Sequence, residues 1–90
     1  MRIQVRLFAN LRDRFPNDDR FPNDDRGRGE IELDERATLA DLIERLEIPD
    51  SLAQMVLIDG LQEPRSHEER ARRTLKDGQT VSIFPPVAGG

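Results

Sequence analysis

The stretch Gln79-Thr-Val-Ser-Ile-Phe-Pro-Pro-Val-Ala-Gly-Gly90 decides how the rest of the chain can be arranged. Its first half alternates between polar and apolar residues, which predicts a β-strand with one buried face. Pro85 and Pro86 end that strand because neither has an N–H to donate to a sheet, and two consecutive prolines favour a stiff, extended conformation. We therefore predict a folded domain over residues 1–84 and an extended tail over 85–90.

The tail loses side-chain bulk toward its end. Val87 and Ala88 are followed by Gly89 and Gly90, and a Gly-Gly end can enter a channel too narrow for any Cβ. We predict that Gly90 carries the reacting carboxyl group, that Gly89 lets a partner's backbone approach closely, and that Val87 and Ala88 line the channel entrance. The two prolines would reduce the conformational freedom lost on insertion. The alternative interpretation is an unstructured tail or a remnant of expression.

The composition is that of one small, acidic domain. Hydrophobic residues make up 36% of the 90 residues, charged residues another 36%, and the net charge is −4. This charge argues against general affinity for nucleic acid or anionic membranes, and the chain has no Trp or Tyr for base stacking. The alternating start, Met1-Arg-Ile-Gln-Val-Arg6, resembles neither a signal peptide nor a membrane span. We expect a cytoplasmic protein that binds neither nucleic acid nor membranes.

The chain contains no cysteine. Disulfides, thiol catalysis and zinc–thiolate sites are therefore excluded. Any sulfur chemistry must use another group, and a C-terminal thiocarboxylate meets that condition. His67 is the only histidine, and we interpret it as a surface residue because the second histidine of a zincin site is missing.

A hexapeptide is repeated in tandem: Arg14-Phe-Pro-Asn-Asp-Asp19 recurs unchanged as Arg20-Phe-Pro-Asn-Asp-Asp25. We interpret the repeat as a duplication within a surface loop over residues 14–29, where added length costs little, and expect this loop to be disordered. The alternative is a Ca²⁺ site built from Asp18, Asp19, Asp24 and Asp25. The spacing of an EF-hand is absent and arginines interrupt the aspartates, so we predict no metal site.

Hydrophobic periodicity predicts one main helix over residues 37–46. Its apolar residues recur at i, i+3, i+4 and i+7, as expected for a helix with one buried face. They are Leu39, Leu42, Ile43 and Leu46. Thr38 can cap the first turn, with Asp41 three residues later in an arrangement close to a capping box.

Short strands surround this helix in the sequence. The Asp59-Gly60 pair predicts a tight hairpin between two of them. Strands are expected at 1–8, 30–34, 55–58, 61–62 and 80–84, turns at 9–14 and 51–54, and a short exposed helix at 66–70.

The alternation of the first and last strands brings two aromatic residues to one face. Phe8 falls on the polar side of the first strand, and Phe84 falls on the polar side of the last. If these strands are neighbours, both rings lie on the outer face of the sheet at the root of the tail, where Leu61 can extend the patch. Clustered exposed apolar groups mark interaction sites, so we predict a docking surface. The alternative for either ring alone is that it folds over the edge of the core.

The segment Leu75-Lys-Asp-Gly-Gln-Thr-Val-Ser-Ile-Phe-Pro-Pro-Val-Ala-Gly-Gly90, together with Leu7-Phe8-Ala9, resembles the MoaD/ThiS family of ubiquitin-like sulfur carriers. Within that family the resemblance is to the small subunit of molybdopterin synthase. It implies an α+β fold of the β-grasp type, a mixed sheet of four to five strands over one main helix. The first and last strands would lie side by side in parallel at its centre.

The resemblance also implies a chemistry in which Gly90 is adenylated with ATP and converted to a thiocarboxylate. An E1-like adenylyltransferase would use the ATP, no cofactor would be bound by this chain, and the catalytic residues would belong to partners. The other expected partner is the molybdopterin synthase large subunit. It would form a heterotetramer with this chain.

Other destinations for the activated terminus stay open. The sulfur could go to thiamin, cysteine or tRNA, or Gly90 could form isopeptide bonds with lysines as a ubiquitin-like modifier. A purely structural domain with an inert tail would leave Gly89 and Gly90 unexplained.

Overall fold

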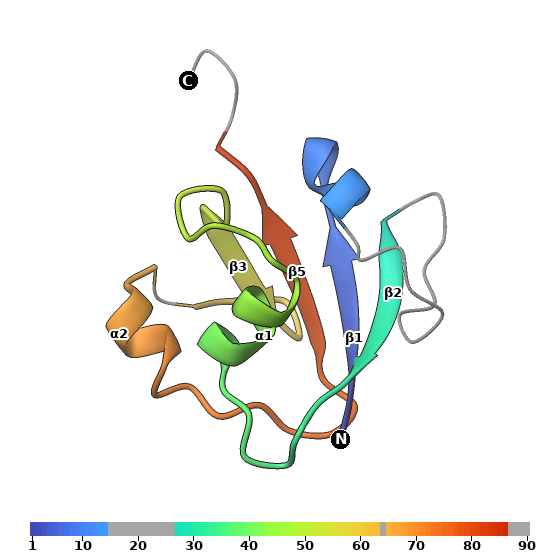
Figure 1. Cartoon of the computed structure of the whole chain (residues 1–90), viewed down its shortest axis with the longest axis vertical. Helices are drawn as coiled ribbons and strands as arrows, with labels where there is room; N and C mark the ends of the chain where they lie inside the picture. Colours follow the sequence, from blue (N-terminus) through green and yellow to red (C-terminus); the bar gives the residue numbers. More distant parts are fainter. Residues whose placement is uncertain (15–26, 64, 87–90) are drawn as a thin grey trace.

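The computed structural model describes residues 1–14, 27–63 and 65–86. One sheet, one main helix and two short helical segments follow each other along the chain (Figure 1). In chain order they are β1 (Arg2–Leu7), the 3₁₀ helix η1 (Ala9–Arg14), β2 (Arg28–Glu32), α1 (Leu39–Arg45), β3 (Met55–Ile58), β4 (Leu61–Gln62), α2 (His67–Arg70) and β5 (Thr80–Phe84).

The sheet has the strand order β2-β1-β5-β3-β4. β1 and β5 run parallel at its centre, with Val5 opposite Val81 and Leu7 opposite Ile83, while the other neighbours are antiparallel. This mixed sheet over one main helix confirms the β-grasp arrangement that the resemblance to the MoaD/ThiS family implied. Because β1 and β5 are parallel, Leu7 and Phe84 lie at the same end of the sheet, from which the chain leaves the domain (Figure 1).

The core lies between α1 and one face of the sheet. Every predicted apolar residue of the helix is buried, as are the inward residues of the central strands Val5, Leu7, Val81 and Ile83. Burying an aliphatic side chain contributes about 1.5–3 kcal/mol, so this face supplies most of the driving force for folding. The opposite face carries no helix among the described residues. No helix in the described ranges is long and apolar enough to cross a membrane.

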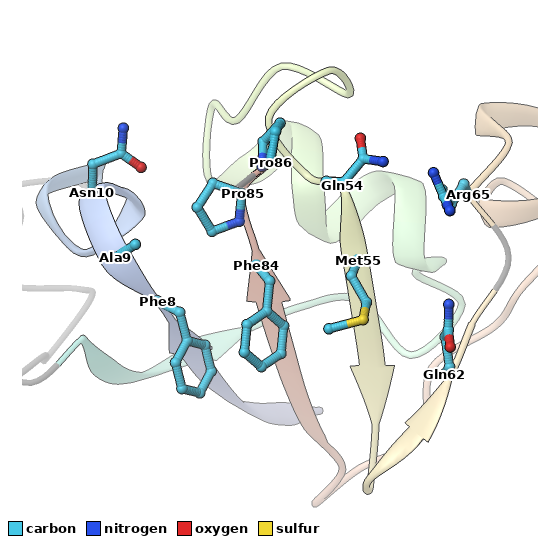
Figure 2. A pocket seen from close by; sticks show the side chains of 10 residues that line it. All are labelled: Phe8, Ala9, Asn10, Gln54, Met55, Gln62, Arg65, Phe84, Pro85 and Pro86. Carbon is cyan, nitrogen blue, oxygen red and sulfur yellow. The ribbon is translucent and has the colours of Figure 1, made fainter. Parts of the chain in front are cut away.

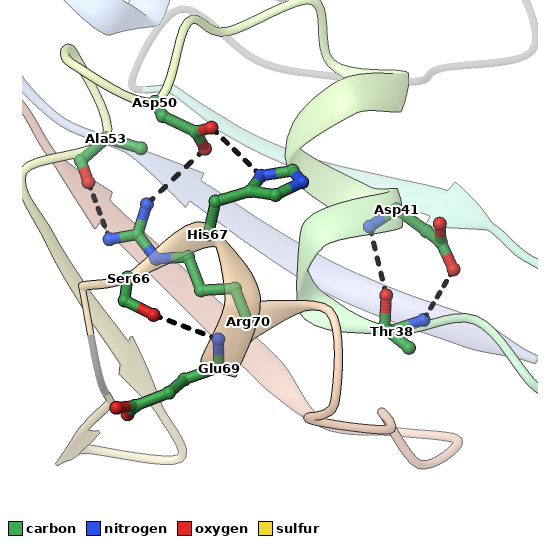
Figure 3. Close-up of polar contacts among 8 residues, drawn as sticks. All are labelled: Thr38, Asp41, Asp50, Ala53, Ser66, His67, Glu69 and Arg70. Atoms are coloured by element: carbon green, nitrogen blue, oxygen red, sulfur yellow. Dashed lines mark hydrogen bonds and ion pairs between the residues drawn. The ribbon is translucent and has the colours of Figure 1, made fainter.

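The N-terminal cap of α1 determines where this helix begins. The Asp41 N–H donates to Thr38 Oγ1 at 3.2 Å, and the Thr38 N–H donates to Asp41 Oδ2 at 2.9 Å, which completes the expected capping box (Figure 3). α1 therefore starts at Leu39, two residues later than predicted.

The predicted loop over 14–29 is shorter than expected. Arg14 belongs to η1, and Arg28 and Gly29 belong to β2, because β1 is long enough to pair with two residues upstream of Glu30. The repeated hexapeptide and its four aspartates fall almost wholly outside the described residues.

The predicted hairpin between β3 and β4 is confirmed. Asp59 and Gly60 both have positive φ angles, 51° and 86°, as a two-residue turn between antiparallel strands requires. Asp59 also accepts the Thr80 N–H through Oδ1 at 2.9 Å. The turn is thereby joined to the start of β5.

The segment predicted as a short exposed helix is not wholly exposed. In α2, Arg70 is 1% exposed, and its Nη2 donates to the Ala53 carbonyl at 2.7 Å (Figure 3). Asp50 Oδ1 lies 3.8 Å from Nη1 and partly balances the charge. Burial lowers the pKa of Arg70, with Asp50 opposing this effect and Arg65 adding to it. His67 is a surface residue, as predicted, and contacts Asp50 at 2.9 Å.

Candidate functional site

Two phenylalanines are stacked at the end of the central strands. The rings of Phe8 and Phe84 have centroids 4.1 Å apart and planes inclined by 11°. The Phe8 N–H donates to the Ile83 carbonyl at 3.2 Å, which holds the residue after β1 against β5. Both rings point away from the helix (Figure 2). The predicted aromatic pair is thus present on the outer face, and the alternative that the rings fold over the core is wrong.

The backbone after Phe8 takes an unusual conformation. Ala9 has a φ of 53°, a left-handed geometry that costs a residue with a Cβ about 1–2 kcal/mol. The turn redirects the chain from β1 into η1, where Leu11 is fully buried. This reversal lets one short segment supply both Phe8 to the outer face and Leu11 to the core.

The stacked pair forms part of a groove of about 590 Å³ (Figure 2). Met55 lies opposite Phe84 in the antiparallel pairing of β3 with β5, and Pro85 and Pro86 continue the groove beyond the end of the sheet. The apolar lining is therefore provided by Phe8, Met55, Phe84 and the two prolines. The root of the tail is a wall of the groove, so whatever binds here also contacts the segment that leads to the C-terminal residues.

The structure does not place Leu61 on this face, contrary to the prediction. Leu61 pairs with Ile58 and Gln62 pairs with Leu57, and paired residues point to the same side of a sheet. Because Ile58 is buried on the helix side, Leu61 belongs to that side, where it is 72% exposed. Gln62 takes the place in the groove expected for Leu61 (Figure 2).

The polar residues of the groove are mostly uncharged. Asn10, Gln54 and Gln62 contribute amides, and Arg65 is the one charged residue in the described lining. The Gln54 N–H donates to the Phe84 carbonyl at 3.0 Å, which fixes the last peptide of β5. Sequence reasoning missed Gln54, Met55 and Arg65, because their convergence depends on the pairing of β3 with β5.

The other predicted site residues cannot be placed. Val87, Ala88, Gly89 and Gly90 lie outside the described residues, as do the four aspartates considered for Ca²⁺. Within residues 1–14, 27–63 and 65–86, no group of three or more potential metal ligands is found.

Comparison with known proteins identifies the family of this chain. The model of the ThiS family matches residues 5–90. Small archaeal modifier protein 3 from Haloferax volcanii is 31% identical over 103 aligned positions, which cover 100% of both chains.

Similar solved structures support the same family assignment. A putative molybdopterin converting factor, subunit 1, from Pyrococcus furiosus is 25% identical, with a TM-score of 0.65 over 97% of this chain and 99% of that one. Subunit 1 and 2 of the molybdopterin-converting factor from Helicobacter pylori were solved as a complex; the matched chain is 20% identical, with a TM-score of 0.57 and 100% coverage of both chains. The protein therefore belongs to the ThiS/MoaD family of ubiquitin-like β-grasp proteins, a family of sulfur carriers and modifiers.

Proposed function

We propose that this protein is a sulfur carrier whose Gly90 carboxyl group is activated and converted to a thiocarboxylate. The observation that carries the proposal is the position of Phe84, Pro85 and Pro86. The strand that ends at Phe84 is held in the centre of the sheet by hydrogen bonds on both sides, and it leads directly into the two prolines and the Gly-Gly end. A partner that binds the groove would therefore receive the tail from a fixed origin.

The chemistry needs a partner because a carboxylate is a poor electrophile. Attack of the Gly90 carboxylate on ATP would give an acyl-adenylate and pyrophosphate. Hydrosulfide would then displace AMP, forming the C–S bond as the C–O bond to phosphate breaks, and would leave a thiocarboxylate and a proton. This chain has no phosphate-binding loop motif, so we assign ATP binding to an E1-like adenylyltransferase and no cofactor to this chain.

For the carrier, the destination that we propose is molybdopterin synthesis. The similarity to a putative molybdopterin converting factor, subunit 1, supports this assignment, and the Helicobacter pylori complex offers a precedent for assembly with a subunit 2. The partner in that step would be a molybdopterin synthase large subunit, with two copies of each chain in a heterotetramer. Thiamin, cysteine and tRNA are the other sulfur acceptors to be tested.

A second role, conjugation to proteins through Gly90, is favoured by one observation. The relative that is 31% identical over the full chain is a small archaeal modifier protein. An acyl-adenylate can be attacked by an amine as well as by a sulfur nucleophile, so both roles can begin with the same activated terminus.

Intact-mass analysis of the protein purified from its native host separates the two roles. An oxygen-for-sulfur exchange at the C-terminus supports the carrier. Larger conjugates that disappear when Gly90 is deleted support the modifier. A terminus that is neither thiolated nor conjugated in cells making molybdenum cofactor would refute both.

A further inference from the structure

The charges around the docking groove point to the kind of surface that it receives. Arg65 is exposed and lies on the rim of the groove, beyond Gln62 (Figure 2). Arg6 is exposed on the same outer face, two residues before Phe8 along β1. Arg65 thus belongs to the groove lining on the β4 side, whereas Arg6 lies outside the lining, on β1 and on the same face as Phe8.

These two arginines differ from most basic residues of the described chain. Arg2 is paired with Glu30, Arg72 with Glu68 and Arg73 with Glu63. By contrast, Arg6 and Arg65 form no ion pair within the described ranges. On β2, the described carboxylates of the outer face are Glu32, opposite Arg2, and Glu30, which lies opposite Gln4 and accepts a hydrogen bond from the Gln4 side-chain amide at 2.8 Å.

Two further arginines lie close to Arg6 and Arg65. Arg28 lies directly opposite Arg6 in the pairing of β1 with β2. The charge of Arg65 is one of the causes that lower the pKa of the buried Arg70, after desolvation by burial. Among the described side chains at this end of the outer face, the charged groups are therefore arginines beside an apolar centre.

The position of Arg65 is fixed by the fold. Arg65 precedes Ser66, the N-cap of α2, and Arg70 of α2 is hydrogen-bonded to the Ala53 carbonyl, next to Gln54 of the groove. The same buried contact that anchors α2 therefore holds Arg65 at the rim.

We infer that the adenylating partner presents an apolar centre flanked by carboxylates, one of which pairs with Arg6 on β1 next to Phe8 and another with Arg65 at the rim of the groove. This inference rests on the proposed function, since it assumes that the partner docks on this face. Charges at the rim of an interface act mainly on the rate of association and on partner choice. Partners that lack these carboxylates would leave both guanidiniums without a counter-charge and would associate slowly.

The test measures association of the full chain with the purified adenylating enzyme of the same organism. R6E and R65E are compared with R36E, which makes the same change in net charge at an exposed arginine in the segment that precedes α1. We expect R6E and R65E each to lower the association rate constant about tenfold at low salt, with the difference shrinking at high salt. R36E should stay within about twofold of the parent.

A second experiment, chemical cross-linking, identifies the group of the enzyme that contacts position 65. R65K places an ammonium at the rim, and the natural Lys76 lies in the turn before β5, far from the tail end of the sheet. A carbodiimide should join position 65 of R65K, but not position 36 of R36K, to an aspartate or glutamate of the enzyme. Association of R6E and R65E at the rate of R36E, with no cross-link from R65K, would overturn the inference.

Failure of the inference can be told from failure of the docking face itself. If Phe84→Arg abolishes association while R6E and R65E behave like R36E, only the role of the charges is wrong. If Phe84→Arg also binds normally, the enzyme docks elsewhere, and both the inference and the docking step of the proposed function are wrong.

Discussion

Phe8 and Phe84 stack face to face with ring centroids 4.1 Å apart, although one follows the first strand and the other ends the last. Parallel pairing of β1 with β5 makes this contact possible, because it brings the C-terminal ends of both strands to one edge of the sheet. Phe8 is exposed, Phe84 is half-buried, and the pair adjoins the prolines of the tail (Figure 2). A partner that binds this aromatic pair would therefore also lie next to the root of the C-terminal segment.

The first prediction concerns this pair. Phe84→Arg should weaken binding of the adenylating enzyme by about 2 kcal/mol or more, because an aromatic ring that becomes buried in the interface would be replaced by a charge. Leu61→Arg is the matched control, since Leu61 is 72% exposed and lies on the other side of the sheet. Isothermal titration calorimetry gives both affinities. Equal losses for the two variants would show that the interface is not confined to the outer face.

The second prediction concerns the terminus. Deletion of Gly90 should abolish thiocarboxylate formation without a change in thermal stability, because the new terminus would fall short of the adenylation site by about 3.5 Å. The assay is intact mass after incubation with the activating enzyme, ATP and a sulfur donor. Thiolation of the shortened chain would remove Gly90 from the mechanism, and a lowered melting temperature would assign it a structural role.

The third prediction concerns Arg70. Arg70→Ala should destabilise the domain by about 2–3 kcal/mol, because the Ala53 carbonyl loses its charged donor and a cavity remains. Arg70→Met should cost less, since it keeps most of the apolar packing of the side-chain stem. Arg72→Ala, which breaks an exposed pair with Glu68, should cost less than about 0.5 kcal/mol. Urea denaturation monitored by circular dichroism supplies the three values, and equal losses for Arg70→Ala and Arg72→Ala would contradict the buried anchor.

The fourth prediction separates the carrier from the modifier. Lys76 is the only lysine of the sequence, and the Met1 amino group donates to the Leu33 carbonyl at 2.7 Å. Any chain formed by self-conjugation should therefore be linked through Lys76, and Lys76→Arg should remove self-linked species while leaving sulfur loading unchanged. Immunoblots and tryptic mapping of the native conjugates provide the readout. Self-linked species that persist in Lys76→Arg would place the linkage at the N-terminal amine.

Local patterns in the sequence determined most of the architecture. The apolar spacing of Leu39, Leu42, Ile43 and Leu46 was enough to predict α1 and its buried face, because helical periodicity is a local property. The alternation around Phe8 and Phe84 likewise assigned both rings to the outer face once their strands were taken as neighbours. Asp59-Gly60 predicted its turn because few residue pairs tolerate two successive positive φ angles.

Only the tertiary structure decided the details of the docking face. β4 contains just Leu61 and Gln62, too few residues to show an alternation, so the pairing with β3 alone settles which of them enters the groove. Arg70 is charged, and nothing local indicates its burial, which depends on the Ala53 carbonyl across the fold. The same long-range contact sets the place of Arg65 beside residues of β3 and β5. Local periodicity reports which face of an element is buried, whereas the identity of its neighbours is a property of the folded chain.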